Sequence, residues 1–175
     1  MKKLTIVICL AVLGLLPAAT LAKPNVNNFA PAVAQNSDTF THPGAGVQFK
    51  VPAGWKAKPD GELITVSSGD DALQVVFWVP DENSFDAAVK ELDKELSKTI
   101  KNLKTEGTPA KDELNGMPHY GETGTGEVNG ATIVWSVDVL GAKKPLIILT
   151  FAAPNLFEKN ADGFEKLLNS IKKVS

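Results

Sequence analysis

The sequence contains no arginine, so lysine supplies all 18 of its basic residues. Arginine provides the planar, two-pronged donor that suits phosphate and carboxylate groups, and lysine does not replace it at such sites. This absence argues against a dedicated nucleotide or phosphoprotein site. Histidine is also scarce, with only His42 and His119. A metal site needs several converging ligands, usually with a close pair of them in the sequence, and the two histidines form no such pair.

Cysteine is nearly absent as well, because Cys9 is the only one among 175 residues. Cys9 follows Ile8, where the modification site of a bacterial lipoprotein requires a small residue, and this argues against a lipid anchor. The chain after residue 22 has no cysteine and forms no disulfide bond, so its fold depends on a hydrophobic core. A domain of about 135 residues is large enough for one, since it buries roughly two-thirds of its unfolded surface.

The first 22 residues combine a basic start, an apolar run over residues 4–16 and small residues at positions 20 and 22. These are the three parts of a secretory signal peptide, and the apolar run is shorter than the ~20 residues that span a membrane. We therefore predict a signal peptide over residues 1–22, cleavage near Ala22 and a secreted or periplasmic protein, with no stable membrane span after cleavage. An uncleaved membrane anchor is the alternative.

Residues 23–38 are rich in asparagine, alanine and proline and lack an apolar period, which predicts a disordered tether. A single domain over residues 39–175 is expected to follow. Without Lys2 and Lys3 the chain keeps 16 lysines against 20 acidic residues, a net charge of about −4. This charge disfavours nucleic acid and anionic membranes as partners, so we expect another exported or envelope protein instead.

Apolar periodicity predicts both strands and helices along this domain. The predicted strands cover residues 46–51, 62–68, 72–79, 117–128, 131–140 and 145–153. Asn129-Gly130 is typical of a type I′ hairpin turn. Apolar stripes at three- and four-residue steps predict a long helix over residues 84–104 and a final helix from about Asn160. This order indicates an α+β fold, an antiparallel β-sheet packed with helices.

The order of these elements resembles the PsbP/Mog1-like superfamily, whose fold is an α/β/α sandwich. It is most similar to the small exported bacterial members, the DcrB- and LpqN-like proteins, over about residues 39–174. The matching residues are Val47, Phe49, Pro52, Gly54, Trp55, Phe164, Leu168, Ser170 and Ile171. The resemblance implies a non-enzymatic accessory or binding domain, as in extrinsic photosystem subunits and small-GTPase-binding proteins. No residues of this chain match a GTPase-binding or photosystem-docking motif.

The glycine-rich stretch 121–126 does not fit a phosphate loop, because it precedes a hairpin rather than a helix. It indicates a twisted strand, a bulge or a close backbone approach. The acidic pairs Asp70-Asp71 and Asp81-Glu82 do not fit a calcium loop. We therefore predict no cofactor and no metal site. A weak metal site, if present, would use His119 with a nearby carboxylate such as Glu122.

Aromatic residues with polar neighbours form the candidate recognition patch. Its members are His119, Tyr120, Glu122 and Trp135. Counting back from the Asn129-Gly130 turn sets the strands of Tyr120 and Trp135 side by side, and aromatic rings beside polar groups on a sheet face suit recognition. Ordinary cross-strand packing of the two rings is the alternative.

The expected function is that of an exported, non-enzymatic binding or accessory domain that acts through protein–protein or envelope interactions. Two alternatives remain. A carrier of a small apolar ligand would hold it between the sheet and the long helix, in a cavity lined by Phe77, Leu92, Leu96 and Phe151. A hydrolase would need a serine or a carboxylate pair within hydrogen-bonding reach of His119 or His42, although no serine lies in a Gly-x-Ser-x-Gly frame.

Overall fold

The chain from Ser37 to Ser175 forms one compact unit, of which the computed structural model describes residues 39–174. The predicted signal peptide and tether lie outside the described residues. Among residues 39–174, no helix combines the length and the apolar character that crossing a membrane requires.

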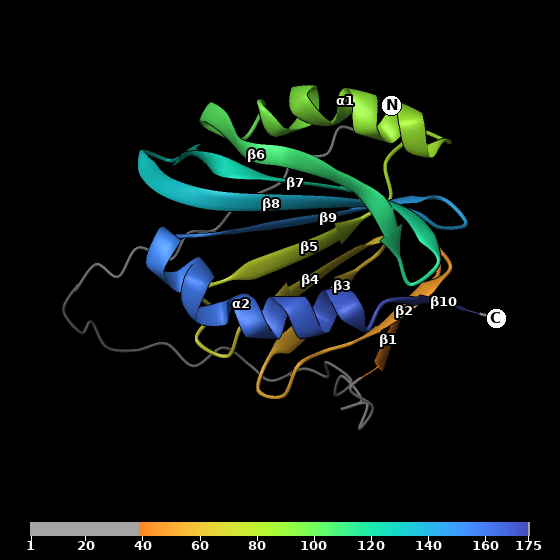
Figure 1. Cartoon of the computed structure of the whole chain (residues 1–175). Helices are drawn as coiled ribbons and strands as arrows, with labels where there is room; N and C mark the ends of the chain where they lie inside the picture. Colours follow the sequence, from red (N-terminus) through yellow and green to blue (C-terminus); the bar gives the residue numbers. More distant parts are fainter. Residues whose placement is uncertain (1–38, 175) are drawn as a thin grey trace, which may run out of the picture. The chain divides into compact units, whose positions relative to one another are not determined.

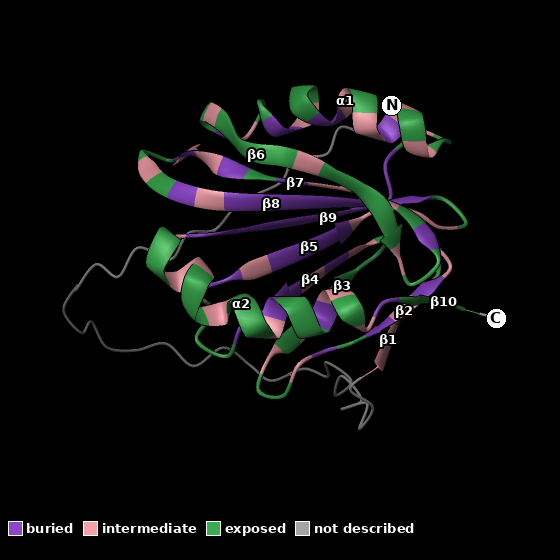
Figure 2. Ribbon diagram, in the orientation of Figure 1, coloured by how far each residue is buried: buried purple, intermediate pink, exposed green. Residues whose placement is uncertain are grey.

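A seven-stranded antiparallel sheet forms the middle layer (Figure 1). Its strands are β3 (Lys56–Asp60), β4 (Leu63–Ser67), β5 (Gln74–Trp78), β6 (Lys101–Leu114), β7 (Met117–Val128), β8 (Ala131–Gly141) and β9 (Pro145–Ala152). They lie in the order β3-β4-β5-β9-β8-β7-β6, so that β9 is central and β3 and β6 are the edges. Figure 2 shows β9 buried along its length and β6 largely exposed. The continuous apolar run of β9 agrees with burial on both faces.

Two helices cover opposite faces of this sheet, α1 (Phe85–Leu96) on one and α2 (Pro154–Asn169) on the other (Figure 1). Leu146 and Ile148 of β9 share a core cluster with Leu167 of α2. Ile147 lies between them, and because strand residues alternate in direction it points to the α1 face. The result is the predicted α+β fold, an α/β/α sandwich.

A small second sheet closes the core beside α2. It consists of β1 (Thr39–His42), β2 (Val47–Lys50) and β10 (Lys172–Lys173), in the order β1-β2-β10. Val47 and Phe49 of β2 are fully buried, and the ring of Phe49 stacks on that of Phe77 with 4.2 Å between the centroids. β10, near the chain end, is thereby bound to β2 through backbone hydrogen bonds.

The predicted long helix is wrong in its second half. Ser84 caps α1 by accepting a hydrogen bond from the backbone of Ala87 at 3.3 Å, and Ala88, Leu92 and Leu96 are buried as the apolar period predicts. The helix ends at Leu96, however, and residues 101–114 form β6. The apolar residues near position 100 fit the helical period, but pairing with β7 overrides that local preference.

Other boundaries differ less. The final helix begins at Pro154 rather than near Asn160, with proline in its first turn, where its missing N–H is harmless. The six predicted strands are confirmed within about two residues at each end, whereas the short strands β1, β3 and β10 were not predicted. Asn129 and Gly130 have φ values of 52° and 80°, as a type I′ turn requires.

Candidate functional site

The four residues of the predicted recognition patch are divided between the two faces of the sheet. In the β7–β8 ladder His119 pairs with Leu140, which belongs to the core cluster on the α2 side. Tyr120 pairs with Val139 and Glu122 with Val137, on the α1 side. Because consecutive strand residues point in opposite directions, His119 does not share a face with Tyr120 or Glu122. The hypothesis of a single patch is therefore wrong.

Trp135, the fourth predicted member of the patch, is also misplaced, because it belongs to the core. It is fully buried, pairs with Gly124 rather than Tyr120, and donates its indole N–H to the carbonyl of Thr125 at 3.0 Å. A Cβ at position 124 would lie 2.6 Å from Cζ2 of Trp135 and 2.0 Å from the carbonyl oxygen of Lys104. The glycine-rich stretch thus marks the predicted close backbone approach, which makes room for this ring.

His119 is held between two aspartates. Its Nδ1 lies 2.5 Å from Oδ1 of Asp112 on β6, and its Nε2 lies 2.9 Å from Oδ1 of Asp138 on β8. Asp138 is buried, whereas Asp112 is exposed. Because both ring nitrogens face carboxylate oxygens, the arrangement favours the protonated imidazole, in which both nitrogens donate. The histidine joins three adjacent strands at the edge of the sheet.

Gly121 makes this arrangement possible. It is the residue that pairs with Asp138, and it lies two positions after His119 on the same face. A Cβ at position 121 would lie 3.0 Å from Cε1 and 3.2 Å from Nε2 of His119. Any side chain there would press against the imidazole ring.

The two aspartates determine the protonation of His119. The hydrogen bond to Asp138 raises the pKa of His119 above its ordinary value, burial opposes this shift, and the hydrogen bond to Asp112 adds to it. A hydrolase would need a ring nitrogen free to accept a proton from a nucleophile. Neither nitrogen of His119 is free, and Ser136 lies against Asp138, at 3.5 Å, rather than against the ring. The carboxylate pair is thus present, but it holds the histidine in its acid form.

Both ring nitrogens of His42 are also hydrogen-bonded. It is fully buried, its Nδ1 accepts the backbone N–H of Ala45 at 3.2 Å, and its Nε2 lies 2.7 Å from the carbonyl oxygen of Glu62. An accepting Nδ1 leaves Nε2 as the donor, which is the neutral tautomer. His42 therefore fastens the turn between β1 and β2 to the turn before β4.

Tyr120 and Glu122 form a second polar group, on the α1 side. Glu122 is buried and accepts hydrogen bonds from the hydroxyls of Tyr120, at 2.8 Å, and Thr105, at 2.5 Å. Burial, followed by the hydrogen bond to Glu122, raises the pKa of Tyr120 to about 12. In β6 the residues 107–109 form a bulge opposite Glu122, because Glu106 pairs with Thr123 and Ala110 with Gly121.

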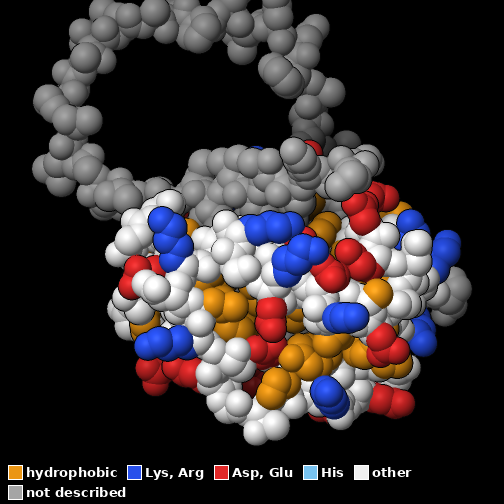
Figure 3. Space-filling model, turned by 90° about the horizontal axis from the view of Figure 1, so that it is seen from above, with side chains coloured by type: hydrophobic (Ala, Val, Ile, Leu, Met, Phe, Trp, Pro, Cys, Tyr) orange, Lys and Arg blue, Asp and Glu red, His pale blue; other side chains and the backbone are white. Residues whose placement is uncertain are grey.

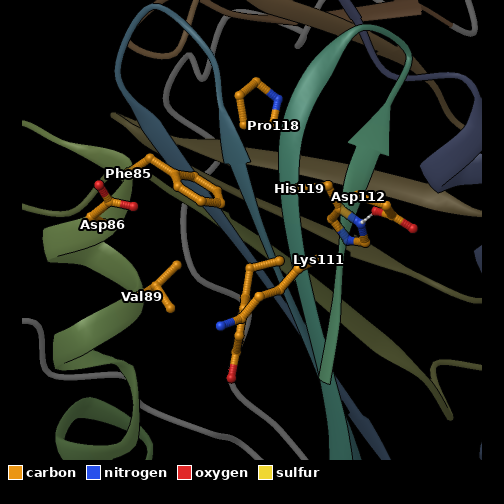
Figure 4. Close-up of a pocket in the computed structure, with 8 residues that line it drawn as sticks. Phe85, Asp86, Val89, Lys111, Asp112, Pro118 and His119 are labelled. Atoms are coloured by element: carbon orange, nitrogen blue, oxygen red, sulfur yellow. Dashed lines mark hydrogen bonds and ion pairs between the residues drawn. The ribbon is translucent and has the colours of Figure 1, made fainter. Parts of the chain in front are cut away.

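A pocket of about 270 Å³ lies between the start of α1 and the β6–β7 hairpin. It is lined by Phe85, Asp86, Val89, Lys111, Asp112, Pro118, His119 and Tyr120. Figure 4 shows Phe85 and Val89 directed from α1 toward the strands and Lys111 on the helix side, whereas His119 and Asp112 point away from α1. The structure describes no ion pair for Lys111, so the pocket combines an apolar wall with an available cation.

The predicted apolar-ligand cavity is not formed by the residues proposed for it. Phe77 lies on the α2 side, in the core cluster, while Leu92 and Leu96 belong to α1 on the other face. All three are buried, as is Phe151. A single cavity lined by residues on two faces of one sheet is excluded, because the sheet itself lies between them.

The described residues contain no group of three or more histidine, cysteine or acidic side chains arranged to hold a metal ion. The pair suggested from the sequence, His119 with Glu122, is separated by the sheet. The aspartates that do reach His119 come from β6 and β8. Sequence analysis missed them because strand register, which is not visible in the periodicity, decides which side chains meet.

No family model matches the chain, and no curated protein matches it in sequence. Solved structures do match. LpqN, involved in cell envelope biogenesis of Mycobacterium tuberculosis, aligns with a TM-score of 0.55 and 12% identity over 80% of this chain and 86% of that chain. Cyanobacterial PsbP (CyanoP) from Synechocystis sp. PCC 6803 aligns with a TM-score of 0.52 and 12% identity over 83% of this chain and 98% of that chain.

These likenesses define the class of the fold. The chain has an α/β/α sandwich similar to that of LpqN and of cyanobacterial PsbP, which is the fold that the sequence resemblance implied. At 12% identity the likeness concerns the fold alone, because unrelated functions are carried by the same fold.

Proposed function

We propose that this protein is an exported, non-enzymatic accessory domain that binds another exported or envelope protein through the pocket between α1 and the β6–β7 hairpin. The observation that carries this proposal is the composition of the pocket. Phe85, Val89 and Pro118 supply apolar surface beside the cation of Lys111. Apolar anchors surrounded by polar groups are typical of the energetic centres of protein interfaces.

The size of the pocket favours a protein side chain over a larger ligand. Its volume of about 270 Å³ is slightly below the ~300–1,000 Å³ of pockets that enclose small molecules. Figure 3 views the domain from the α1 side, where hydrophobic side chains form patches among lysines and acidic residues. A partner could cover several such patches while inserting one anchor.

Two further observations support an accessory role in the envelope. Both described histidines are occupied by structural hydrogen bonds, so neither offers a base for catalysis. The start of the sequence has the pattern of a secretory signal. LpqN, which shares the fold, is involved in cell envelope biogenesis. A role in the envelope is compatible with export of this chain.

The test is site-specific crosslinking followed by a binding measurement. A photoreactive amino acid replaces Phe85 in the native host, and the crosslinked protein is identified by mass spectrometry. The dissociation constant of the purified pair is then measured by calorimetry for the native protein, for Val89→Asp and for Lys111→Glu. Lys104→Glu, on the same strand β6 but outside the pocket, is the matched control.

We expect Val89→Asp to weaken binding at least about tenfold, since burying a carboxylate against an apolar anchor costs ~1.4 kcal/mol or more. Lys104→Glu should change the dissociation constant little. If the purified partner binds native protein and Val89→Asp equally well, the pocket is not its binding site and the proposal fails.

A further inference from the structure

Four exposed lysines gather at one end of the domain although they lie in two distant parts of the sequence. Lys143 and Lys144 form the turn between β8 and β9, and Lys172 and Lys173 form β10 at the chain end. Figure 1 shows this turn and β10 at the same end of the domain.

Backbone contacts at the β1–β2 turn hold the two lysine pairs together. The N–H of Lys143 donates to the carbonyl of Ala45 at 3.1 Å, and the N–H of Val174 donates to the carbonyl of Gly46 at 3.0 Å. The β8–β9 turn and the chain end therefore flank the same two residues. Lys173 adds a pairing with Val47, the next residue along.

These lysines are not neutralised by neighbouring acids. None of the ion pairs among the described residues includes Lys143, Lys144, Lys172 or Lys173. Glu62 also reaches this end, where its carboxylate lies near Gly44. Glu113 lies on the neighbouring β6–β7 hairpin, where it pairs with Pro118. The four lysines nevertheless concentrate positive charge at this end, in a chain whose formal net charge is −2.

An aliphatic side chain stands beside the lysines. Among residues 39–174, Val174 is the one large hydrophobic side chain that lies exposed, at 45%. It directly follows Lys173 at the end of β10. Lysines next to an exposed aliphatic group form the combination that binds the interface of an anionic bilayer, where the charges meet headgroups and the apolar group enters the acyl boundary.

We propose that this lysine patch (Lys143, Lys144, Lys172 and Lys173, with Val174) docks the domain onto an anionic lipid surface. Lysine is a point charge without the fixed fork of arginine, so it suits a diffuse layer of headgroups better than the directed carboxylates of an acidic protein. The domain can bind an anionic surface although its net charge is negative, because the lysines lie together at one end. Screening confines electrostatic attraction to about 8 Å at physiological salt, so the acidic residues elsewhere oppose the binding little. The proposal does not rest on the α1 pocket, although Pro118 of that pocket lies beside Gly141, next to the β8–β9 turn.

The test is sedimentation of residues 37–175, a compact unit with its own core, with vesicles of phosphatidylglycerol or of phosphatidylcholine. The patch variant is K143E/K144E/K172E/K173E, and a second variant carries glutamine at the same positions in case charge reversal disturbs folding. The matched control is K58E/K90E/K101E/K104E, which changes the net charge equally at four exposed lysines on β3, α1 and β6. Circular dichroism verifies the fold of each variant.

We expect binding to phosphatidylglycerol that weakens with salt and binding to phosphatidylcholine that is undetectable. Each lysine near an anionic surface strengthens binding about fivefold, so the patch variant should bind at least about 100-fold more weakly and the control less than about fivefold. Native protein that does not bind phosphatidylglycerol at low salt would overturn the proposal, as would equal losses in the two charge-reversed proteins. Equal affinity for soluble polyglutamate would assign the patch to an acidic protein instead.

Discussion

The buried carboxylate of Asp138 accepts a hydrogen bond from Nε2–H of His119 at 2.9 Å. The other ring nitrogen of His119 faces Asp112 at the surface. This histidine therefore connects the interior of the sheet to its edge strand. A buried carboxylate costs free energy unless it is paired and hydrogen-bonded, so Asp138 depends on the protonated ring.

The stability of the domain should depend on pH through His119. A histidine whose pKa is raised in the folded state contributes stability that is complete below its unfolded pKa of about 6.5 and is lost as the pH rises through the folded pKa. His119→Gln should lower the free energy of unfolding by about 1–3 kcal/mol below pH 6.5, since Asp138 loses a charged donor. The difference between the two proteins should shrink as the pH rises. Urea unfolding from pH 5 to 9 measures it, and a difference that stays constant with pH would contradict the assignment.

Gly121→Ala should disturb the position of His119 while leaving the histidine itself in place. The added methyl group would lie 3.0 Å from Cε1 of His119, so the ring must shift by a few tenths of an ångström, and we expect this shift to weaken its hydrogen bond to Asp138. We expect a loss of about 1–2 kcal/mol in the free energy of unfolding and a flatter dependence on pH. Thr123→Ala, at an exposed position on the same strand and face, is the control. Imidazole nitrogen shifts measured by NMR should report a lower pKa for His119 in the first variant only.

Gly124→Ala should be the more severe of the glycine substitutions. The new methyl group would meet the backbone carbonyl of Lys104 and the ring of Trp135, neither of which is the flexible end of a side chain. Overpacking of a filled core costs ~1–3 kcal/mol or more, and here the edge strand β6 would have to move. Thermal unfolding followed by Trp fluorescence measures the loss. A melting temperature within a degree of that of the native protein would show that the β6–β7 pair is less tightly packed than the structure has it.

Tyr120 can be titrated alone, because it is the only tyrosine in the sequence. Burial and the hydrogen bond to Glu122 raise its pKa to about 12, so the ultraviolet signal of tyrosinate should have its midpoint about two pH units above the ordinary value of about 10. Glu122→Gln should bring the midpoint down partway, since burial remains and the negative neighbour is removed. A native midpoint near 10 would mean that the ring is open to water.

The hairpin, the helix faces and most strands could be predicted from the sequence because their signals are local. Asn129 and Gly130 adopt positive φ, which these two residue types tolerate well, and side chains two positions apart in β8 lie on the same face. The end of α1 could not be predicted in this way. Residues 97–104 continue the helical period, but the hydrogen bonds between β6 and β7 stabilise the strand more than the local preference stabilises a helix.

The candidate site was predicted only in part for the same reason. His119 and Tyr120 both border the pocket, but the sequence placed them in one patch with Trp135, which is buried in the core. Which side chains meet across a sheet depends on register and on strand order, and neither follows from the period of a single strand.

The sequence by itself determined the absence of disulfides from the domain, the α+β class and the resemblance to PsbP/Mog1-like proteins, since composition and short-range periodicity carry these properties. Only the tertiary structure decided that His119 lies between Asp112 and Asp138 and that the lysines of a turn and of the chain end lie at the same end of the domain. These groups are distant in the sequence, and they meet because antiparallel pairing brings remote segments within hydrogen-bonding distance.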